Sequence, residues 1–214
     1  MPNYADINGR PMKKLQIQQY LRKLQLNDFE PAVNLATLTK LQDAHLKYIP
    51  YENFDSLNGK ITSLKRQDMF NKVIMHNRGG ICFELNGLYN WLLESLGFEV
   101  TSYAARFIDK METYQLRRHR VMCVALGEKR YLTDVGVNSE SPRVPLEITE
   151  GLIQSDGISQ YKFTRSEFWG WLLWQKERGK IWKRLFGFTE EPQIDKDFIT
   201  ASFWCDAHPD SPFI

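Results

Sequence analysis

The spacing of apolar residues changes character near Gly97. Before Gly97, apolar residues recur every three or four positions, which is typical of helices with one buried face. They predict four helices, over residues 17–24, 38–48, 69–74 and 82–96. After Gly97, apolar runs and alternating patterns predict strands at 99–107, 119–126, 130–137 and 159–165. The chain is therefore expected to have an α+β fold, with a helical part followed by an antiparallel sheet or small barrel.

The amino-acid composition excludes several classes of function. With 214 residues, 43% of them apolar, the chain can bury a core as one large domain or two small lobes. The 28 basic and 26 acidic residues are spread along the sequence and form no basic stripe, so neither nucleic acid nor a membrane surface is an expected partner. No apolar run approaches the roughly 18 residues that span a bilayer, and the first residues lack a signal core. We expect a cytoplasmic protein.

The chain has three cysteines, Cys82, Cys123 and Cys205. An odd number at wide spacings fits neither a disulfide framework nor paired zinc sites, so we expect reduced thiols and no metal. No bound cofactor is expected either. Cys82 follows Gly79 and Gly80 in RGGICFELNGL, at the start of a predicted helix. The positive end of a helix favours a thiolate there. Simple packing of a buried cysteine fits the same position, and a nucleophile additionally needs a base and a group that orients it.

The histidines offer one candidate base. His45, His76 and His208 suit structural roles, whereas His119 opens a strand directly after a charged loop. Asp134 lies among apolar residues on the next strand, where a carboxylate needs a partner. The chain order Cys, His, Asp indicates thiol acyl transfer, a chemistry shared by cysteine proteases, transglutaminases and acetyltransferases.

The predicted hairpin does not by itself bring His119 and Asp134 into contact. If it turns about Glu128 and Lys129, Asp134 lies opposite Cys123. His119 and Asp134 then project from the same face but four residues apart, about 13 Å along a strand. A plain hairpin of this register leaves them out of contact.

Several motifs together resemble those of the arylamine N-acetyltransferase family: HLKYIPYENFD, RGGICFELNGL, HRVMCVAL, YLTDVGV, FGFTEEPQIDKDF and HPDSPF. The resemblance runs from about Leu38 to the end of the chain. It implies a helical bundle carrying the nucleophile (residues 1–97), a β-barrel (98–188) and a connector with the remnant of an α/β lid (189–214), around a cysteine-protease-like core. Family members usually continue beyond the last motif, so most of the lid is expected to be missing, and a homo-oligomer that covers the exposed surface is one expected outcome.

The resemblance also implies residue roles. Cys82 is the acetylated nucleophile, His119 the base and Asp134 the residue that orients His119. Acetyl-CoA is the donor co-substrate, and an arylamine, arylhydrazine or N-hydroxyarylamine removes the acetyl group in a ping-pong reaction of xenobiotic metabolism. Arg78 and Glu52 are expected to pair beneath the site, and Gly79 and Gly80 to allow the tight turn into the helix.

The substrate-binding residues implied by the family differ here from its usual pattern. Tyr51 and Val137 stand where phenylalanine is usual, which adds a hydroxyl and widens the acceptor pocket. Asn138 and Ser139 stand where glycines are usual, in a loop expected to flank CoA. The implied substrate or cofactor-binding set is Tyr51, Phe54, Gly136, Val137, Asn138 and Ser139.

Three functions therefore remain open. The chain is an acetyltransferase of reduced activity, or a catalytically silent homologue that acts as a binding or vestigial protein, or, more remotely, a protease or transglutaminase. The RGGICFELNG context argues against the third.

Overall fold

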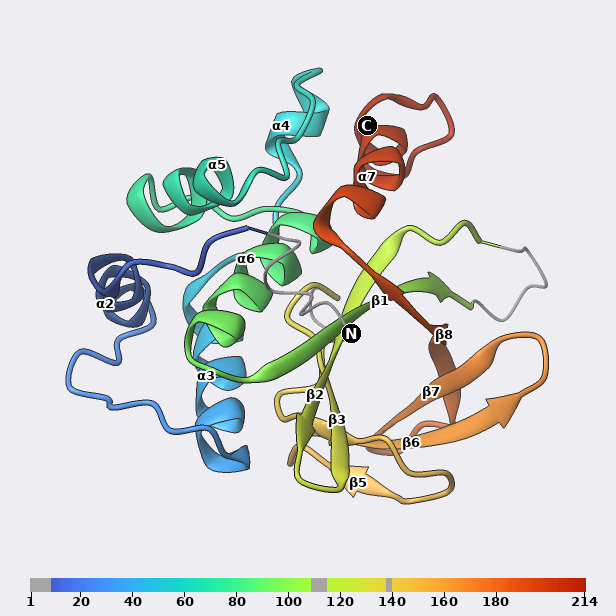
Figure 1. Ribbon diagram of the computed structural model, residues 1–214. Helices are drawn as coiled ribbons and strands as arrows, with labels where there is room; N and C mark the ends of the chain where they lie inside the picture. Colours follow the sequence, from blue (N-terminus) through green and yellow to red (C-terminus); the bar gives the residue numbers. More distant parts are fainter. Residues whose placement is uncertain (1–8, 109–114, 138–139) are drawn as a thin grey trace.

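The helices form where the apolar positions recur at helical spacing. The computed structural model describes residues 9–108, 115–137 and 140–214 (Figure 1). The four predicted helices correspond to α2, α3, α5 with its continuation η1, and α6. Their bounds, with the short α4, are α2 (Lys14–Lys23), α3 (Leu35–Tyr48), α4 (Phe54–Leu57), α5 (Arg66–Phe70), the π-helix η1 (Asn71–Met75) and α6 (Cys82–Ser95).

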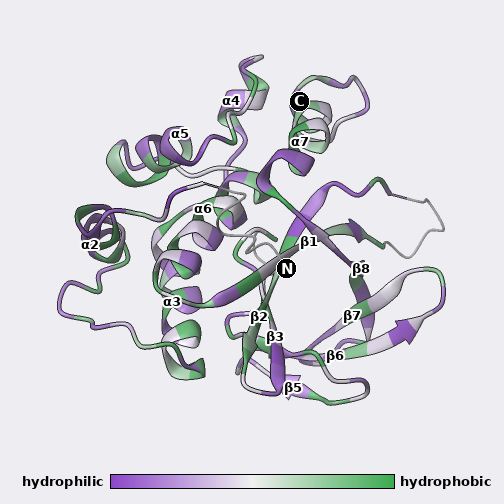
Figure 2. Cartoon of the chain, viewed as in Figure 1, coloured by the Kyte–Doolittle hydropathy of each residue, from purple (hydrophilic) through white to green (hydrophobic). Residues whose placement is uncertain are grey.

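Helix α6 lies at the centre of the helical part. Every residue from Cys82 to Leu93 is buried, because neighbouring helices cover one side of α6 and the sheet covers another. Its leucines pack in one core cluster with residues of α2 and α3, including Tyr20, Leu21, Leu38, Leu41, Leu85, Leu88 and Leu92. Figure 2 shows polar and apolar residues interleaved along α2 and α3, as expected for helices that each bury one face.

Eight antiparallel strands form one sheet that curves into a nearly closed barrel, in the order β4-β3-β2-β1-β8-β7-β6-β5. The two outer strands meet through one side chain: Gln154 accepts a hydrogen bond from the Glu147 N–H (2.7 Å) and donates one to the Glu147 carbonyl (2.9 Å). The expected mixture of helices and antiparallel sheet is confirmed. The strands are β1 (Glu99–Phe107), β2 (His119–Leu126), β3 (Lys129–Thr133), β4 (Leu146–Glu147), β5 (Gln154–Ser155), β6 (Ser159–Ser166), β7 (Gly170–Glu177) and β8 (Lys183–Gln193).

Strands β1 to β3 are buried on both faces. One face contributes Tyr103, Val121 and Leu132 to the core inside the barrel. The other contributes Met122 and Val124 to the core shared with the helices. Because side chains alternate along a strand, His119 lies on the barrel face with Val121, and the following residue faces the helices.

The hairpin register differs from the one expected. The two-residue loop is Gly127 and Glu128, so Leu126 pairs with Lys129. Gly127 has φ of 62°, a conformation that favours glycine at the first position of such loops. The expected pairing of Asp134 with Cys123 is therefore wrong. Strand β3 ends at Thr133, and Asp134 follows it two residues nearer to His119 than expected.

The end of the chain returns to the start of α6 (Figure 1). Strand β8 continues past the expected boundary at residue 188 and pairs with β1 up to Gln193. The 3-10 helix η3 (Asp195–Phe198) and α7 (Ile199–Ala207) follow. Phe198 and Cys205 then pack against Ile81, Cys82 and Phe83. No helix among the described residues is long and apolar enough to cross a membrane.

Candidate active site

Cys82 is the first residue of α6 and is only 2% exposed. Glu84 holds the turn that precedes Cys82 in place. One Glu84 carboxylate oxygen accepts a hydrogen bond from the Ile81 N–H (3.0 Å), and the other lies 2.8 Å from Lys72 Nζ. A Cβ added at Gly80 would lie 2.6 Å from the first of these oxygens. Gly80 is thus required for this carboxylate to reach the helix start.

The segment around Pro50 packs under the same turn. A Cβ at Gly79 would lie 1.9 Å from the Pro50 carbonyl oxygen, so no side chain fits there. Arg78 donates to Glu52 at 2.9 Å and also lies 3.2 Å from Asp55, so the expected Arg78–Glu52 pair is present. These contacts hold the backbone that leads into α6.

His119 and Asp134 form a fully buried pair. Nε2 of His119 lies 2.7 Å from Oδ2 of Asp134, and both side chains have 0% exposure. The rings of Phe107 and Phe186 pack on the imidazole, with centroids 5.0 and 5.4 Å away. Nδ1 of His119 has no hydrogen-bond partner among the described residues. One ring nitrogen is thus engaged by the carboxylate, and the other is unused.

The loop that carries Asp134 packs on the first turn of α6. The other carboxylate oxygen, Oδ1, accepts hydrogen bonds from the Gly136 N–H and from Asn86 Nδ2, each at 2.8 Å. A Cβ added at Gly136 would lie 2.8 Å from the Cα of Cys82. The thiol of Cys82 donates to the carbonyl of Arg118, the residue before His119, at 3.6 Å. The structure therefore brings Cys82, His119 and Asp134 to one place.

The electrostatics of the thiol differ from those expected for a helix start. Burial raises the pKa of Cys82, and the neighbouring groups Cys205 and Asp134 raise it further. The backbone N–H of Arg120 and the charge of Arg118 act in the opposite direction. Burial therefore outweighs the helix end, and proton transfer to a base is needed to form the thiolate.

Comparisons with known proteins show the family of this chain. The family model described as N-acetyltransferase matches residues 34–214. The chain is 34% identical over 201 residues to the arylamine N-acetyltransferase of Mycolicibacterium smegmatis, covering 91% of this chain and 72% of that enzyme. This chain belongs to the arylamine N-acetyltransferase family.

Two further relatives show the extent of the match. The arylamine N-acetyltransferase of Escherichia coli (strain K12) is 31% identical over 183 residues, which are 85% of this chain and 64% of that enzyme. The solved structure of the Mycobacterium marinum enzyme in complex with CoA has a TM-score of 0.85 and 27% identity, and the match covers 92% of this chain and 73% of that one. The chain thus spans about two thirds of the length of these relatives.

Of the residues that the family resemblance assigns to substrate or cofactor binding, two lie at the cysteine. Tyr51 pairs with Gly80 in an isolated parallel bridge and packs against the cluster that contains Cys82. Burial raises the pKa of its hydroxyl, and the backbone N–H of Cys82 forms a hydrogen bond with it. Gly136 lies directly on Cys82, as described above.

The other four residues of this set lie away from the cysteine or outside the described residues. Val137 is 5% exposed and belongs to the core cluster inside the barrel. Phe54 begins α4 and is 61% exposed, outside the cluster around the cysteine. Asn138 and Ser139 lie outside the described residues.

Two polar residues at the site were missed by sequence reasoning. Asn86, one helical turn after Cys82, contacts Asp134. Its spacing from Cys82, four residues along a buried helix, was a usable signal. Arg120 is 2% exposed and donates to Ser102 and to Asp195, at 2.9 Å in each case. No local sequence pattern predicts that Arg120 would contact residues so far away in the sequence.

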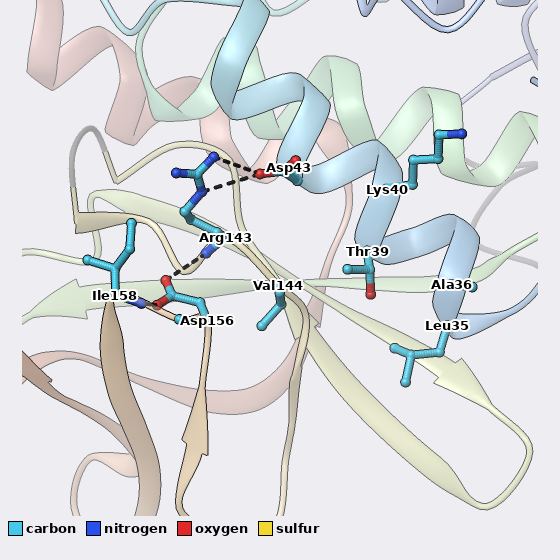
Figure 3. A pocket seen from close by; sticks show the side chains of 10 residues that line it. Leu35, Ala36, Thr39, Lys40, Asp43, Arg143, Val144, Asp156 and Ile158 are labelled. Carbon is cyan, nitrogen blue, oxygen red and sulfur yellow. Dashed lines mark hydrogen bonds and ion pairs between the residues drawn. The ribbon is translucent and has the colours of Figure 1, made fainter.

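A separate pocket of about 860 Å³ lies between α3 and the loops around residues 143 and 157 (Figure 3). Arg143 donates to Asp43 with two nitrogens, at 3.2 and 2.9 Å. None of the predicted site residues lines this pocket. Among the described residues, no group of three or more histidines, cysteines and carboxylates is arranged to hold a metal ion.

Proposed function

We propose that this chain transfers acetyl groups from acetyl-CoA to arylamines and arylhydrazines, and to the oxygen of N-hydroxyarylamines, by a ping-pong reaction through acetyl-Cys82. Membership of the arylamine N-acetyltransferase family supports this proposal. The M. marinum relative in complex with CoA supports CoA as the carrier of the acetyl group.

The observation that carries the proposal is the buried His119–Asp134 pair at the start of α6, with Nδ1 of His119 unused. Because Asp134 accepts a hydrogen from Nε2, Nδ1 carries a lone pair and acts as the base for the thiol of Cys82. The resulting thiolate attacks the carbonyl carbon of acetyl-CoA. The bond from that carbon to the CoA sulfur then breaks, and the proton on His119 passes to the departing CoA thiolate.

The first turn of α6 supplies the charge stabilisation for this step. The first backbone N–H groups of a helix have no partner within it and point outward along its axis. The N–H of Cys82 is one of them, and it lies next to the carbon that is attacked, so the oxyanion replaces the Tyr51 hydroxyl as its acceptor. It therefore stabilises the oxyanion of the tetrahedral intermediate, together with the positive end of the helix.

The second half-reaction regenerates the thiol. An aromatic amine of low basicity is unprotonated at neutral pH and attacks acetyl-Cys82 directly. His119 accepts the proton that the nitrogen loses, and the bond from the acetyl carbon to the Cys82 sulfur breaks. The proton then returns to the sulfur. A thioester is the suitable intermediate because its exchange with the CoA thioester is nearly balanced in free energy.

Intact-mass measurement after incubation with acetyl-CoA tests the proposal. We expect the mass to rise by one acetyl group, peptide mapping to place it on Cys82, and an added arylamine to remove it. Cys82→Ala should abolish the gain. A parallel incubation with p-nitrophenyl acetate separates donor binding from chemistry. No acetylation of folded protein by either donor would contradict the proposal and favour the silent homologue.

A further inference from the structure

Asn86 lies one turn along α6 from Cys82 and has 0% exposure. Its side-chain nitrogen donates to the carbonyl of Arg120 (2.6 Å) and to Oδ1 of Asp134 (2.8 Å). Its side-chain oxygen accepts from the N–H of Val135 (2.9 Å). Both N–H groups and the oxygen of this amide are therefore engaged, and the pattern of donors and acceptors permits only one orientation of the amide.

These three bonds join the three segments that form the proposed site. Arg120 follows His119 on β2, Val135 follows Asp134 after β3, and Asn86 is on the helix that carries Cys82. A single amide thus fixes the position of α6 relative to both members of the His119–Asp134 pair. In a buried site, such a bond network is costly to break because each separated group loses its partner without gaining water.

The two carboxylate oxygens of Asp134 have different hydrogen-bond partners. Oδ1 accepts from Asn86 and from the backbone of Gly136, whereas Oδ2 faces Nε2 of His119. With two donors on Oδ1, Oδ2 is the oxygen left to accept a hydrogen bond from the imidazole. The hydrogen of neutral His119 then resides on Nε2, and Nδ1 remains free of it.

We propose that Asn86 is a positioning residue for acyl transfer: by holding Asp134 it fixes the Nε2–H tautomer of His119, so that Nδ1 is the base for Cys82. The proposal rests on the function proposed above. Asn86 acts through Asp134 and touches neither substrate nor the thiol proton.

The same helix offers a matched control. Asn90 lies one turn further along α6 and is 1% exposed, and its side-chain nitrogen donates to Glu94 at 2.7 Å, within the helix. Among the described residues, its side chain makes no hydrogen bond with β2 or with the loop after β3. Replacing Asn90 therefore removes a buried amide from α6 without disturbing the site.

The first test compares Asn86→Ala, Asn86→Asp and Asn90→Ala in single-turnover acetylation of Cys82. We expect Asn86→Ala to slow the acetylation rate constant about 10- to 100-fold with little change in the donor concentration at half-saturation, because one hydrogen bond to a charged group is lost. Asn86→Asp keeps the shape but places a second carboxylate against Asp134, so the pH profile of acetylation should shift. Asn90→Ala should acetylate at close to the wild-type rate.

The second test needs no Asn86 variant. Nitrogen NMR of the wild-type chain, with His119 assigned by its loss in His119→Gln, reports which ring nitrogen carries the hydrogen. Hydrogen on Nε2 supports the proposal, and hydrogen on Nδ1 overturns it even if the Asn86 variants do not fold. Equal acetylation rates for folded Asn86→Ala and Asn90→Ala would also overturn it. Failure of the wild type itself to acetylate would instead count against the proposed function.

Discussion

His45 makes the folded chain sensitive to mild acid. The ring is fully buried on α3, tilted against Tyr20 and Tyr89, with centroids 6.1 and 5.4 Å away. Neither ring nitrogen has a partner among the described residues. Burial lowers the pKa of His45 from 6.5 to about 3. Both neighbouring phenols have pKa values raised by burial, so neither contributes a charge that would stabilise an imidazolium.

The sign of the effect follows from the lowered pKa. Below pH 6.5 the unfolded chain binds a proton at His45, whereas the folded chain does not until the pH approaches 3. The stabilisation is therefore complete above pH 6.5 and is lost as the pH falls. A difference of 3.5 pKa units corresponds to about 5 kcal/mol in total, of which about 2 to 3 kcal/mol is lost between pH 7.5 and 4.5.

Urea unfolding of wild type and His45→Phe across this pH range measures the effect. The variant keeps an aromatic ring and every other titrating group, so the difference in slope belongs to His45. We expect the free energy of unfolding of the wild type to fall about 2 to 3 kcal/mol more than that of the variant. Parallel curves for the two proteins would refute the reasoning and show that His45 is protonated in the folded state.

Three further predictions concern the site. Burial raises the pKa of all three thiols, but the proposed base His119 serves Cys82, so iodoacetamide should label Cys82 before the other two cysteines. His119→Gln should remove this preference, and equal labelling in the wild type would contradict the assignment. His119→Gln and Asp134→Asn should each slow acetylation of Cys82 about 10³- to 10⁴-fold, measured by single-turnover mass spectrometry. Gly136→Ala should slow it about 10²-fold, because the added Cβ displaces the start of α6; acetylation at the wild-type rate would exclude that displacement.

Much of the local structure could be predicted from the sequence. The helix start at Cys82 was predictable because two glycines precede an apolar pattern of helical period, and α6 begins there. The strands around His119 were predictable from their apolar runs. The family resemblance identified the pairing of Arg78 with Glu52, which the structure contains at 2.9 Å.

The parts that could not be predicted depend on contacts between distant segments. The bonds of Asn86 reach residues 34 and 48 to 49 positions away, and the partner of Arg120 on η3 is 75 positions away. The sequence allowed a buried Cys82 but could not identify what covers it, because Phe198 of η3 and Cys205 of α7 reach the helix start from far along the chain. An expectation based only on the helix end therefore gave the wrong direction for the pKa of Cys82.

The hairpin turn shows how a remote feature sets the geometry of the site. Gly127 and Glu128 form the loop, and every pairing from Leu126 with Lys129 to Met122 with Thr133 follows from that choice. A loop moved by one residue would shift the register by two, which is the error of about 7 Å that kept Asp134 apart from His119 in the sequence-based register. A single inserted residue would turn the side chains of β3 to the opposite face. The contact between Asp134 and His119 therefore depends on a glycine that touches neither of them.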